Sequence, residues 1–201
     1  RAHLTGRNRV VFSAVWAHDN TTLVGPGWNA RVSGPVDLAF DRAGATAYLV
    51  CQQSDDVLVF PTNVQFSRPA GAPPLAEVPV GSRPIGVAAS PTQSRLFVLN
   101  HLSRDVSVID TGSLSEIARI GVTPLTPEPL APDVLRGAKL FNTTTDPRIS
   151  AGKVACASCH PDGAGDGHVW AFAQFGAGQR KTLSLFGMRL SMGPQVGGKG
   201  Q

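Results

Sequence analysis

The chain has 201 residues, of which 42% are hydrophobic, enough for one good-sized domain or two small ones. Glycine and proline together supply close to a fifth of the chain, which is too turn-rich for a helix bundle, and no Gly-X-Y period or heptad run suggests collagen or a coiled coil. No apolar run approaches the roughly 18 residues that cross a bilayer, so we expect no membrane span in this segment.

The net charge of +4 is unevenly distributed. Residues 1–131 are balanced, with ten arginines, no lysine and ten acidic residues, whereas residues 132–201 carry eight basic residues against four acidic ones. This break predicts two modules with different partners. We expect the basic module to bind an acidic protein rather than nucleic acid, because no basic cluster is interleaved with aromatic residues. Both ends look cut, so we expect a processed or partial chain.

An internal repeat with a spacing of 49 residues runs through the first module. Its two copies, Pro35–Pro61 and Pro84–Asp110, align without gaps, and each separates short apolar runs with turn residues. The pattern predicts three strands per copy and a fourth strand in the run that follows each copy. The expected strands are 36–40, 46–51, 56–60, 75–80, 85–89, 95–100, 105–109 and 116–122.

Four strands in a period of about 40–50 residues are typical of a β-propeller blade. The stretches RPIGVAASP (83–91) and LFVLNHLSRDVSVIDTGSLSEIARIGV (96–122) resemble the YVTN family of propeller repeats. The first copy departs from that pattern at Cys51, where asparagine is expected. From its apolar strand we interpret Cys51 as a buried small hydrophobic residue. The resemblance implies four-stranded blades arranged around an axis.

We therefore expect blades at 35–83 and 84–122, with a degenerate partial blade at 1–34. A closed propeller needs at least about four blades. The remainder is expected to be missing from a truncated chain, although other chains that complete the propeller, or an open stack of blades, are alternatives. Residues 123–132 form a Pro-rich linker, after which a helix is predicted over Pro132–Phe141.

The motif Cys156-Ala157-Ser158-Cys159-His160 is C-x-x-C-H. Two thiols three residues apart on a turn can reach the two vinyl groups of a haem and form thioethers, and the next residue, His160, then meets the iron as its proximal ligand. A zinc site would need further ligands, and no second cysteine pair is present. A thioredoxin-like redox pair would need a βαβ context. The motif predicts one covalently bound haem c.

The flanks of this motif resemble the bacterial di-haem cytochrome c peroxidase/MauG group over Asp133–Met188. The resemblance is carried by R-G-x-x-L-F at 136–141, by Asp146-Pro147, and by the stretch Gln179–Leu185. It implies a small α-helical cytochrome c-like module at 133–201, expected to be truncated. Gly137 costs about 1 kcal/mol inside a helix relative to alanine, so we expect close packing there.

The same resemblance implies that Arg180 contacts a haem propionate and that Trp170 packs near the haem edge. The alternatives are a solvated surface charge for Arg180 and plain core packing for Trp170. Members of the group carry two C-x-x-C-H motifs, whereas this chain has one. An enzyme built on this chain alone would therefore lack its second redox centre.

The sixth ligand of the iron stays open. Met188 and Met192 lie 28 and 32 residues beyond His160 and are candidate distal ligands, or else apolar gap fillers. His168 is a further candidate, and an open site or a ligand from elsewhere is the remaining alternative. Asp162 and Asp166 lie in a glycine-rich loop, where we favour a simple turn over a calcium site, because the other carboxylates of a calcium loop are missing.

From these observations we expect a c-type cytochrome that transfers electrons in the periplasm or outside the cell, since the family resemblance implies maturation outside the cytoplasm. One alternative is part of a di-haem peroxidase or MauG-like oxidase whose second haem lies outside this chain. The other is a propeller that binds a partner and carries an accessory haem.

Overall fold

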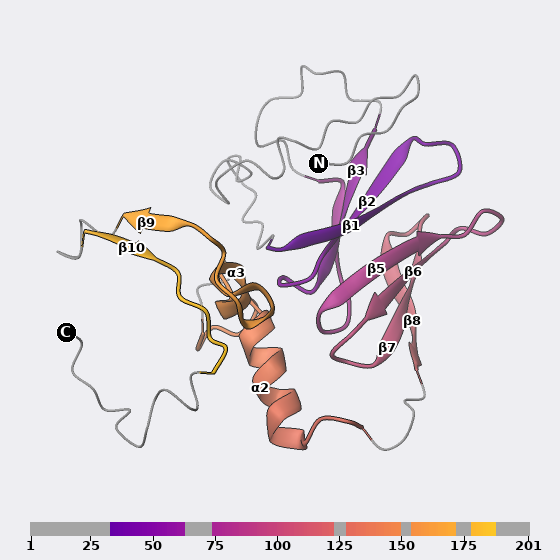
Figure 1. Ribbon diagram of the computed structural model, residues 1–201. Helices are drawn as coiled ribbons and strands as arrows, with labels where there is room; N and C mark the ends of the chain where they lie inside the picture. The colour runs from indigo at the N-terminus through magenta and orange to yellow at the C-terminus, as the bar shows by residue number, and fades with distance from the viewer. Residues whose placement is uncertain (1–32, 63–73, 123–127, 150–153, 172–177, 188–201) are drawn as a thin grey trace. The chain divides into compact units, whose positions relative to one another are not determined.

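The structure is a computed structural model that describes residues 33–62, 74–122, 128–149, 154–171 and 178–187. The chain divides into two compact units, Arg1–Ala155 and Cys156–Gln201. Among the described residues, the first unit contains two four-stranded antiparallel sheets and helix α2, and the second contains a short helix, a 3₁₀ turn and a two-stranded ribbon (Figure 1). None of the helices in the described residues is long and apolar enough to cross a membrane.

Each sheet is a meander of consecutive antiparallel strands, with the orders β1-β2-β3-β4 and β5-β6-β7-β8. This blade-like pairing confirms the eight strands predicted from the repeat to within a residue at each end. The first sheet comprises β1 (Pro35–Phe40), β2 (Thr46–Cys51), β3 (Asp56–Pro61) and β4 (Ala76–Pro79). The second comprises β5 (Pro84–Ala89), β6 (Arg95–Asn100), β7 (Asp105–Asp110) and β8 (Ser115–Gly121). The partial blade predicted at 1–34 lies almost entirely outside the described residues.

The repeat also extends to backbone detail. The register shifts near the start of β1 and again at the equivalent point of β5. In the turn between β2 and β3, Asp55 has a φ of 57°, and Arg104, at the same position of the second copy, has a φ of 58°. Residues other than glycine rarely adopt this left-handed backbone conformation. Its recurrence at equivalent positions shows that both copies use the same turn geometry.

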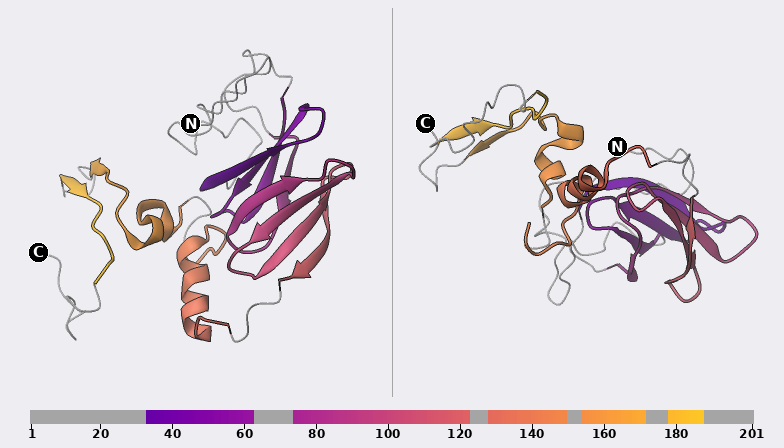
Figure 2. Two further views of the ribbon diagram at one scale, coloured as in Figure 1. Left: turned by 45° about the vertical axis from the view of Figure 1, so that its right-hand side comes forward. Right: turned by 90° about the horizontal axis from the view of Figure 1, so that it is seen from below.

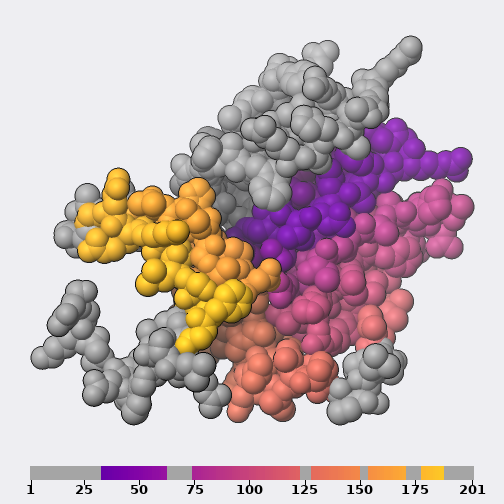
Figure 3. All heavy atoms as spheres, in the orientation of Figure 1, coloured from indigo at the N-terminus to yellow at the C-terminus, as the bar shows by residue number. Residues whose placement is uncertain are grey.

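The main hydrophobic core lies between the two sheets, which pack side by side (Figure 3). Its buried side chains are Tyr48, Val50, Val57, Val59, Val78, Val80, Leu96, Val98 and Ile109. Burial of one such aliphatic side chain contributes roughly 1.5–3 kcal/mol, so this cluster is sufficient to hold the two sheets together. Cys51 is fully buried in β2, as its apolar strand predicted.

Helix α2 spans Pro132–Asn142 and confirms the predicted helix. Proline occupies its first turn, and the Asn142 amide donates a hydrogen bond to the Ala138 carbonyl (2.9 Å) where the helix ends. A Cβ placed on Gly137 would meet nothing within 4 Å. The close packing expected at Gly137 therefore has no partner in the described part of the chain.

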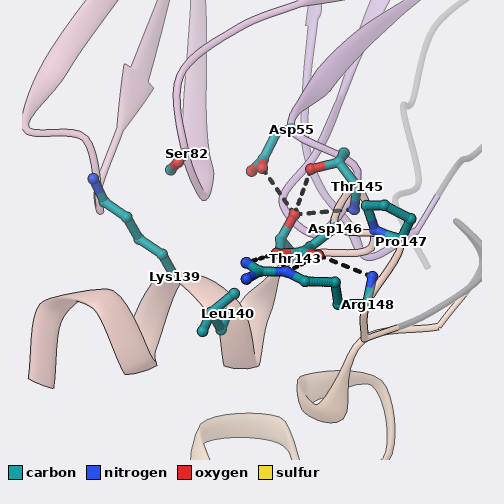
Figure 4. Close-up of a pocket in the computed structure, with 9 residues that line it drawn as sticks. All are labelled: Asp55, Ser82, Lys139, Leu140, Thr143, Thr145, Asp146, Pro147 and Arg148. Carbon is teal, nitrogen blue, oxygen red and sulfur yellow. Dashed lines mark hydrogen bonds and ion pairs between the residues drawn. The ribbon is translucent and has the colours of Figure 1, made fainter. Parts of the chain in front are cut away.

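The segment after α2 is bonded to the turn between β2 and β3. The Thr144 backbone N–H and side-chain hydroxyl both donate to the Gln53 carbonyl (2.8 and 3.1 Å), and the Thr143 hydroxyl donates to Asp55 Oδ2 (3.2 Å). These bonds attach the end of α2 to the first unit. The sequence analysis had counted this helix with the haem module. A pocket of about 480 Å³ lies beside them (Figure 4). It is lined by Asp55, Ser82, Lys139, Leu140, Thr143, Thr145, Asp146, Pro147 and Arg148.

The second unit contains little helix. It consists of α3 (Cys156–Cys159), the 3₁₀ turn η1 (Pro161–Gly163), and the ribbon of β9 (Val169–Ala171) and β10 (Gln179–Lys181), shown in orange and yellow in Figure 2. Pro161 cannot donate to a helix, and three glycines follow within six residues. The described residues of this unit therefore do not form the small α-helical module that the sequence analysis expected.

Candidate functional site

Helix α3 is a single turn with a cysteine at each end. Cys156 is exposed, Cys159 is half-buried, and both are free thiols. Residues three apart on a helix lie on the same face. The two thiols are therefore available on one side of the turn. The backbone N–H of His160 donates to the Cys156 carbonyl (3.0 Å), so the histidine continues this turn directly.

His160 is oriented by a hydrogen bond within its own loop. Its Nδ1 lies 3.2 Å from the Ala164 carbonyl oxygen. A carbonyl can only accept, so Nδ1 carries the proton in this bond, and the lone pair of the neutral ring is on Nε2. A metal-binding histidine typically has this arrangement, with one ring nitrogen donating to a carbonyl and the other facing the metal.

The loop that follows His160 has a tightly constrained backbone. Asp162 and Gly163 have positive φ values of 51° and 83°. A Cβ on Gly165 would lie 2.6 Å from the backbone oxygen of Thr182, closer than real Cβ atoms approach. Only glycine fits at position 165 without moving this neighbouring strand of chain. The Leu185 N–H also donates to the Gly163 carbonyl (2.8 Å), which ties the segment after β10 to the same loop.

Asp166 connects the end of α3 to the ribbon. Its backbone N–H donates to the Cys159 carbonyl (3.0 Å), and its carboxylate accepts from the His168 backbone N–H (2.9 Å) and from Trp170 Nε1 (3.1 Å). The same indole N–H also lies 3.0 Å from the Thr182 hydroxyl. Burial acts to raise the pKa of Asp166, but the hydrogen bonds from His168, Thr182 and Trp170 outweigh it and lower that pKa.

The surroundings of Cys159 favour its protonated thiol over the thiolate. Burial raises the pKa of the Cys159 thiol, and the proximity of Asp166 and Cys156 raises it further. Reactive redox cysteines have lowered pKa values, and zinc binds thiolates. Within the described ranges, moreover, no three His, Cys, Asp or Glu side chains gather where they could hold a metal ion.

The ribbon brings together two residues that the family resemblance assigned to the haem. Trp170 in β9 and Arg180 in β10 are direct partners in the antiparallel register. Both are exposed, and Arg180 donates to the neighbouring Gln179 carbonyl (2.9 Å). The His168 ring lies 5.8 Å from the Trp170 ring. Met188 and Met192 lie outside the described residues, so the sixth ligand stays a prediction.

Large apolar side chains are unusually exposed in this small unit. Leu183 and Phe186 are 75% and 72% exposed, and Val169 and Trp170 are exposed as well. Such a concentration of uncovered apolar surface is typical of a site that receives an apolar ligand or partner. These residues follow the cysteine turn in the chain. The hydrogen bonds of Asp166 and Leu185 connect their segments to the loop after that turn.

Two participants in this site were missed by the sequence analysis. Ala164 contributes only its carbonyl oxygen, and no side-chain pattern reveals that role. Asp166 was interpreted as part of a simple turn, yet its carboxylate holds the loop and the ribbon together. The spacing of Asp166 four residues before Trp170 was the available signal, since an indole N–H is a donor that a nearby carboxylate can accept.

Comparisons with known proteins leave the family of this chain open. No family model matches the chain, and no curated protein matches it. Similar solved structures include Kuenenia stuttgartiensis hydrazine synthase, with 26% identity over 49% of this chain and 26% of that one, at a TM-score of 0.41. A candidate 6-phosphogluconolactonase from Bacteroides uniformis has 19% identity over 47% of this chain and 31% of that one, at a TM-score of 0.37.

A third similar structure is Sqt1 from Chaetomium thermophilum, with 18% identity over 43% of this chain and 20% of that one, at a TM-score of 0.35. The chain thus spans less than a third of the length of each of these three proteins. All three TM-scores lie below 0.5, so the description of the sheets as blade-like depends on their strand order and register.

Proposed function

We propose that this chain carries one haem c, joined by thioethers to Cys156 and Cys159 and ligated by His160, and that it transfers electrons. The observation that carries the proposal is the bond from His160 Nδ1 to the Ala164 carbonyl, which leaves Nε2 as the free ring nitrogen. This bond sits at the end of a helical turn whose two cysteines are unpaired.

The surroundings fit the group in three further respects. The thiols lie at i and i+3 on one turn, the spacing that two vinyl groups require. The exposed side chains of Val169, Trp170, Leu183 and Phe186 would be covered by a planar apolar macrocycle, which would remove the energetic cost of leaving them in water. Arg180, opposite Trp170 in the ribbon, supplies a cation for a propionate.

The chemistry that such a group supplies is one-electron oxidation and reduction. The protein's part is to fix the imidazole through Ala164, to hold the loop through Asp166, and to exclude water with its apolar side chains. The basic excess of residues 132–201 favours docking to an acidic redox partner. We place the protein in the periplasm or outside the cell, as the resemblance to exported cytochromes implies.

We further propose that the two sheets are blades of a propeller that other blades complete. The face of β6 that carries Phe97 and Leu99 is exposed, although the equivalent face of β2, with Tyr48 and Val50, is buried against the second sheet. A following blade would cover this apolar face in the same way.

Haem attachment is tested by producing the chain in a host with a cytochrome c maturation system. We expect a red protein with one haem per chain by pyridine haemochrome. Cys156→Ala and Cys159→Ala should each lose one thioether, and the double variant should lose the covalent haem. Cys51→Ala removes the third cysteine, which is buried in β2, and should keep the full haem content. Colourless wild-type protein of unmodified mass would overturn the proposal.

Reaction with peroxide separates a carrier from a peroxidase-like enzyme. A low-spin spectrum that does not change with peroxide supports the electron carrier, because all six positions of the iron are then filled. A high-spin spectrum that peroxide alters would favour the oxidase instead. Substitution of Met188, Met192 and His168 one at a time, followed by the same spectrum, identifies the sixth ligand.

A further inference from the structure

The loop between His160 and the ribbon contains two carboxylates, and one of them, Asp166, is bonded both to the end of α3 and to the residues that begin the ribbon. We propose that Asp166 is a positioning residue that controls the hydrogen bond on His160 and thereby the reduction potential of the site. This inference rests on the proposed haem, and it assigns a role to a residue that no motif of the sequence identified.

Asp166 closes the loop at both ends. Its backbone N–H is bonded to the Cys159 carbonyl at the end of α3, and its two carboxylate oxygens accept from His168 and Trp170 in the approach to β9. The carbonyl that accepts from His160 belongs to Ala164, two residues earlier in the same closed loop. The direction of that carbonyl therefore depends on where Asp166 is held.

Backbone bonds also hold this loop. The Gly163 N–H donates to the His160 carbonyl (3.0 Å), and the Ala164 N–H donates to the Pro161 carbonyl (2.9 Å). Asp162 and Gly163 adopt left-handed conformations, which cost energy and need support from surrounding bonds. The carboxylate of Asp166 ties this strained loop to Trp170 in β9, so its displacement would let the Ala164 carbonyl move.

The hydrogen bond on the His160 imidazole affects the reduction potential of the site. A strong bond from Nδ1 to a carbonyl raises the electron-donating power of Nε2, and second-shell hydrogen bonding of this kind is one of the protein's means of setting a haem potential. A weaker bond makes the ligand a poorer donor, which favours the reduced iron. We therefore expect the potential to rise when Asp166 is displaced.

The test separates position from charge by using two carboxylates of one loop. Asp166→Glu keeps the charge but moves the carboxylate by one methylene, and Asp166→Asn removes the charge. Asp162→Asn removes a charge from the exposed neighbour, where asparagine also tolerates the left-handed backbone. The potential is measured by redox titration of haem-loaded protein, and hydrogen exchange of the His160 Nδ1 proton is followed by NMR.

We expect Asp166→Glu to raise the potential and to speed exchange of the Nδ1 proton. Asp166→Asn should raise the potential more than Asp162→Asn does. Equal shifts for the two asparagine variants, with Asp166→Glu unchanged, would mean that charge alone acts and would overturn the inference while leaving the haem proposal intact. Wild-type protein without covalent haem would overturn both.

Discussion

The two four-stranded sheets have the same strand order and the same turn geometry, yet they differ in what covers equivalent faces. Tyr48 in β2 is 2% exposed, because the second sheet packs on it, whereas Phe97 at the same position of β6 is 36% exposed. The repeated pattern is therefore sufficient to form the strands, but the stability that each side chain contributes depends on its neighbours. Equivalent positions in sequence are not equivalent in energy.

The sheets differ again at the polar end of their second and third strands. In the second sheet Asn100 Nδ2 donates to Asp105 Oδ1 (2.7 Å) and to the Ser107 hydroxyl (2.8 Å), all three being buried. In the first sheet Cys51 takes the place of Asn100, and Leu58 takes the place of Ser107. The amide and the hydroxyl of the second sheet are thus replaced by a thiol and an apolar side chain in the first sheet.

The buried acid of the first sheet keeps part of the same bonding. Ser54 donates to Asp56 (3.0 Å), as Ser103 donates to Asp105 (2.9 Å). Burial raises the pKa of Asp56 well above its usual range, and the negative charge of Glu77 raises it further, while hydrogen bonds from Ser54 and Cys51 act to lower it.

The largest expected effect is the difference in unfolding free energy between variants at the two equivalent aromatic positions, Tyr48 and Phe97. Tyr48→Ala should lower the free energy of unfolding by about 3–5 kcal/mol, because it removes a fully buried ring from the core between the sheets. Phe97→Ala should cost only about 1–2 kcal/mol, since much of that ring is already in water. Urea unfolding followed by circular dichroism measures both. Equal losses would show that the second sheet does not cover Tyr48 in solution.

The next comparison uses alanine at the two network positions. Asn100→Ala leaves Asp105 and Ser107 without their amide donor and should cost about 2–3 kcal/mol. Cys51→Ala removes one buried sulfur and should cost about 1 kcal/mol, because the Ser54 hydroxyl still donates to Asp56. The same urea experiment applies. A loss at Cys51 as large as that at Asn100 would contradict the view that the second sheet depends more strongly on the side chain at this position.

The smallest expected effect is the pH dependence of stability that Asp55 causes in the turn between β2 and β3. Burial raises the pKa of Asp55 to about 6, against a bond from the Arg83 N–H, a bond from Thr143 and the charge of Lys139, which all lower it. Because this pKa lies above the ordinary value of 3.8, the stability that the neutral carboxyl contributes is complete below pH 3.8 and is lost as the pH rises through about 6.

Asp55→Asn should remove that dependence and stabilise the protein at pH 7 by about 1–2 kcal/mol, since the amide can still accept from Arg83 and needs no charge. Asp133→Asn is the control, because it removes the same charge from an exposed position on α2. Melting temperatures of the wild type and both variants, measured between pH 4 and pH 8, test whether Asp55 causes the pH dependence. If Asp55→Asn and the wild type lose stability in parallel as the pH rises, Asp55 is not the titrating group.

How far the sequence could predict this protein depends on whether a feature is local. The strands followed from alternation and turn residues within each copy, and α2 followed from its proline and its apolar spacing. The glycine-rich turn after Pro161 was also visible, yet the family resemblance outweighed it and led to the expectation of a helical module. The roles of the Ala164 carbonyl and of Asp166 arise from contacts across a loop, which residue types alone do not specify.

The central claim is tested most directly by the mass of one peptide. Trypsin cleaves after Lys153 and Arg180, so a single fragment, residues 154–180, contains both cysteines of the motif and His160. After production with a cytochrome c maturation system, this fragment should be heavier by one haem, and the fragment that contains Cys51 should have its unmodified mass. An unmodified mass for residues 154–180 would contradict covalent haem attachment and the function built on it.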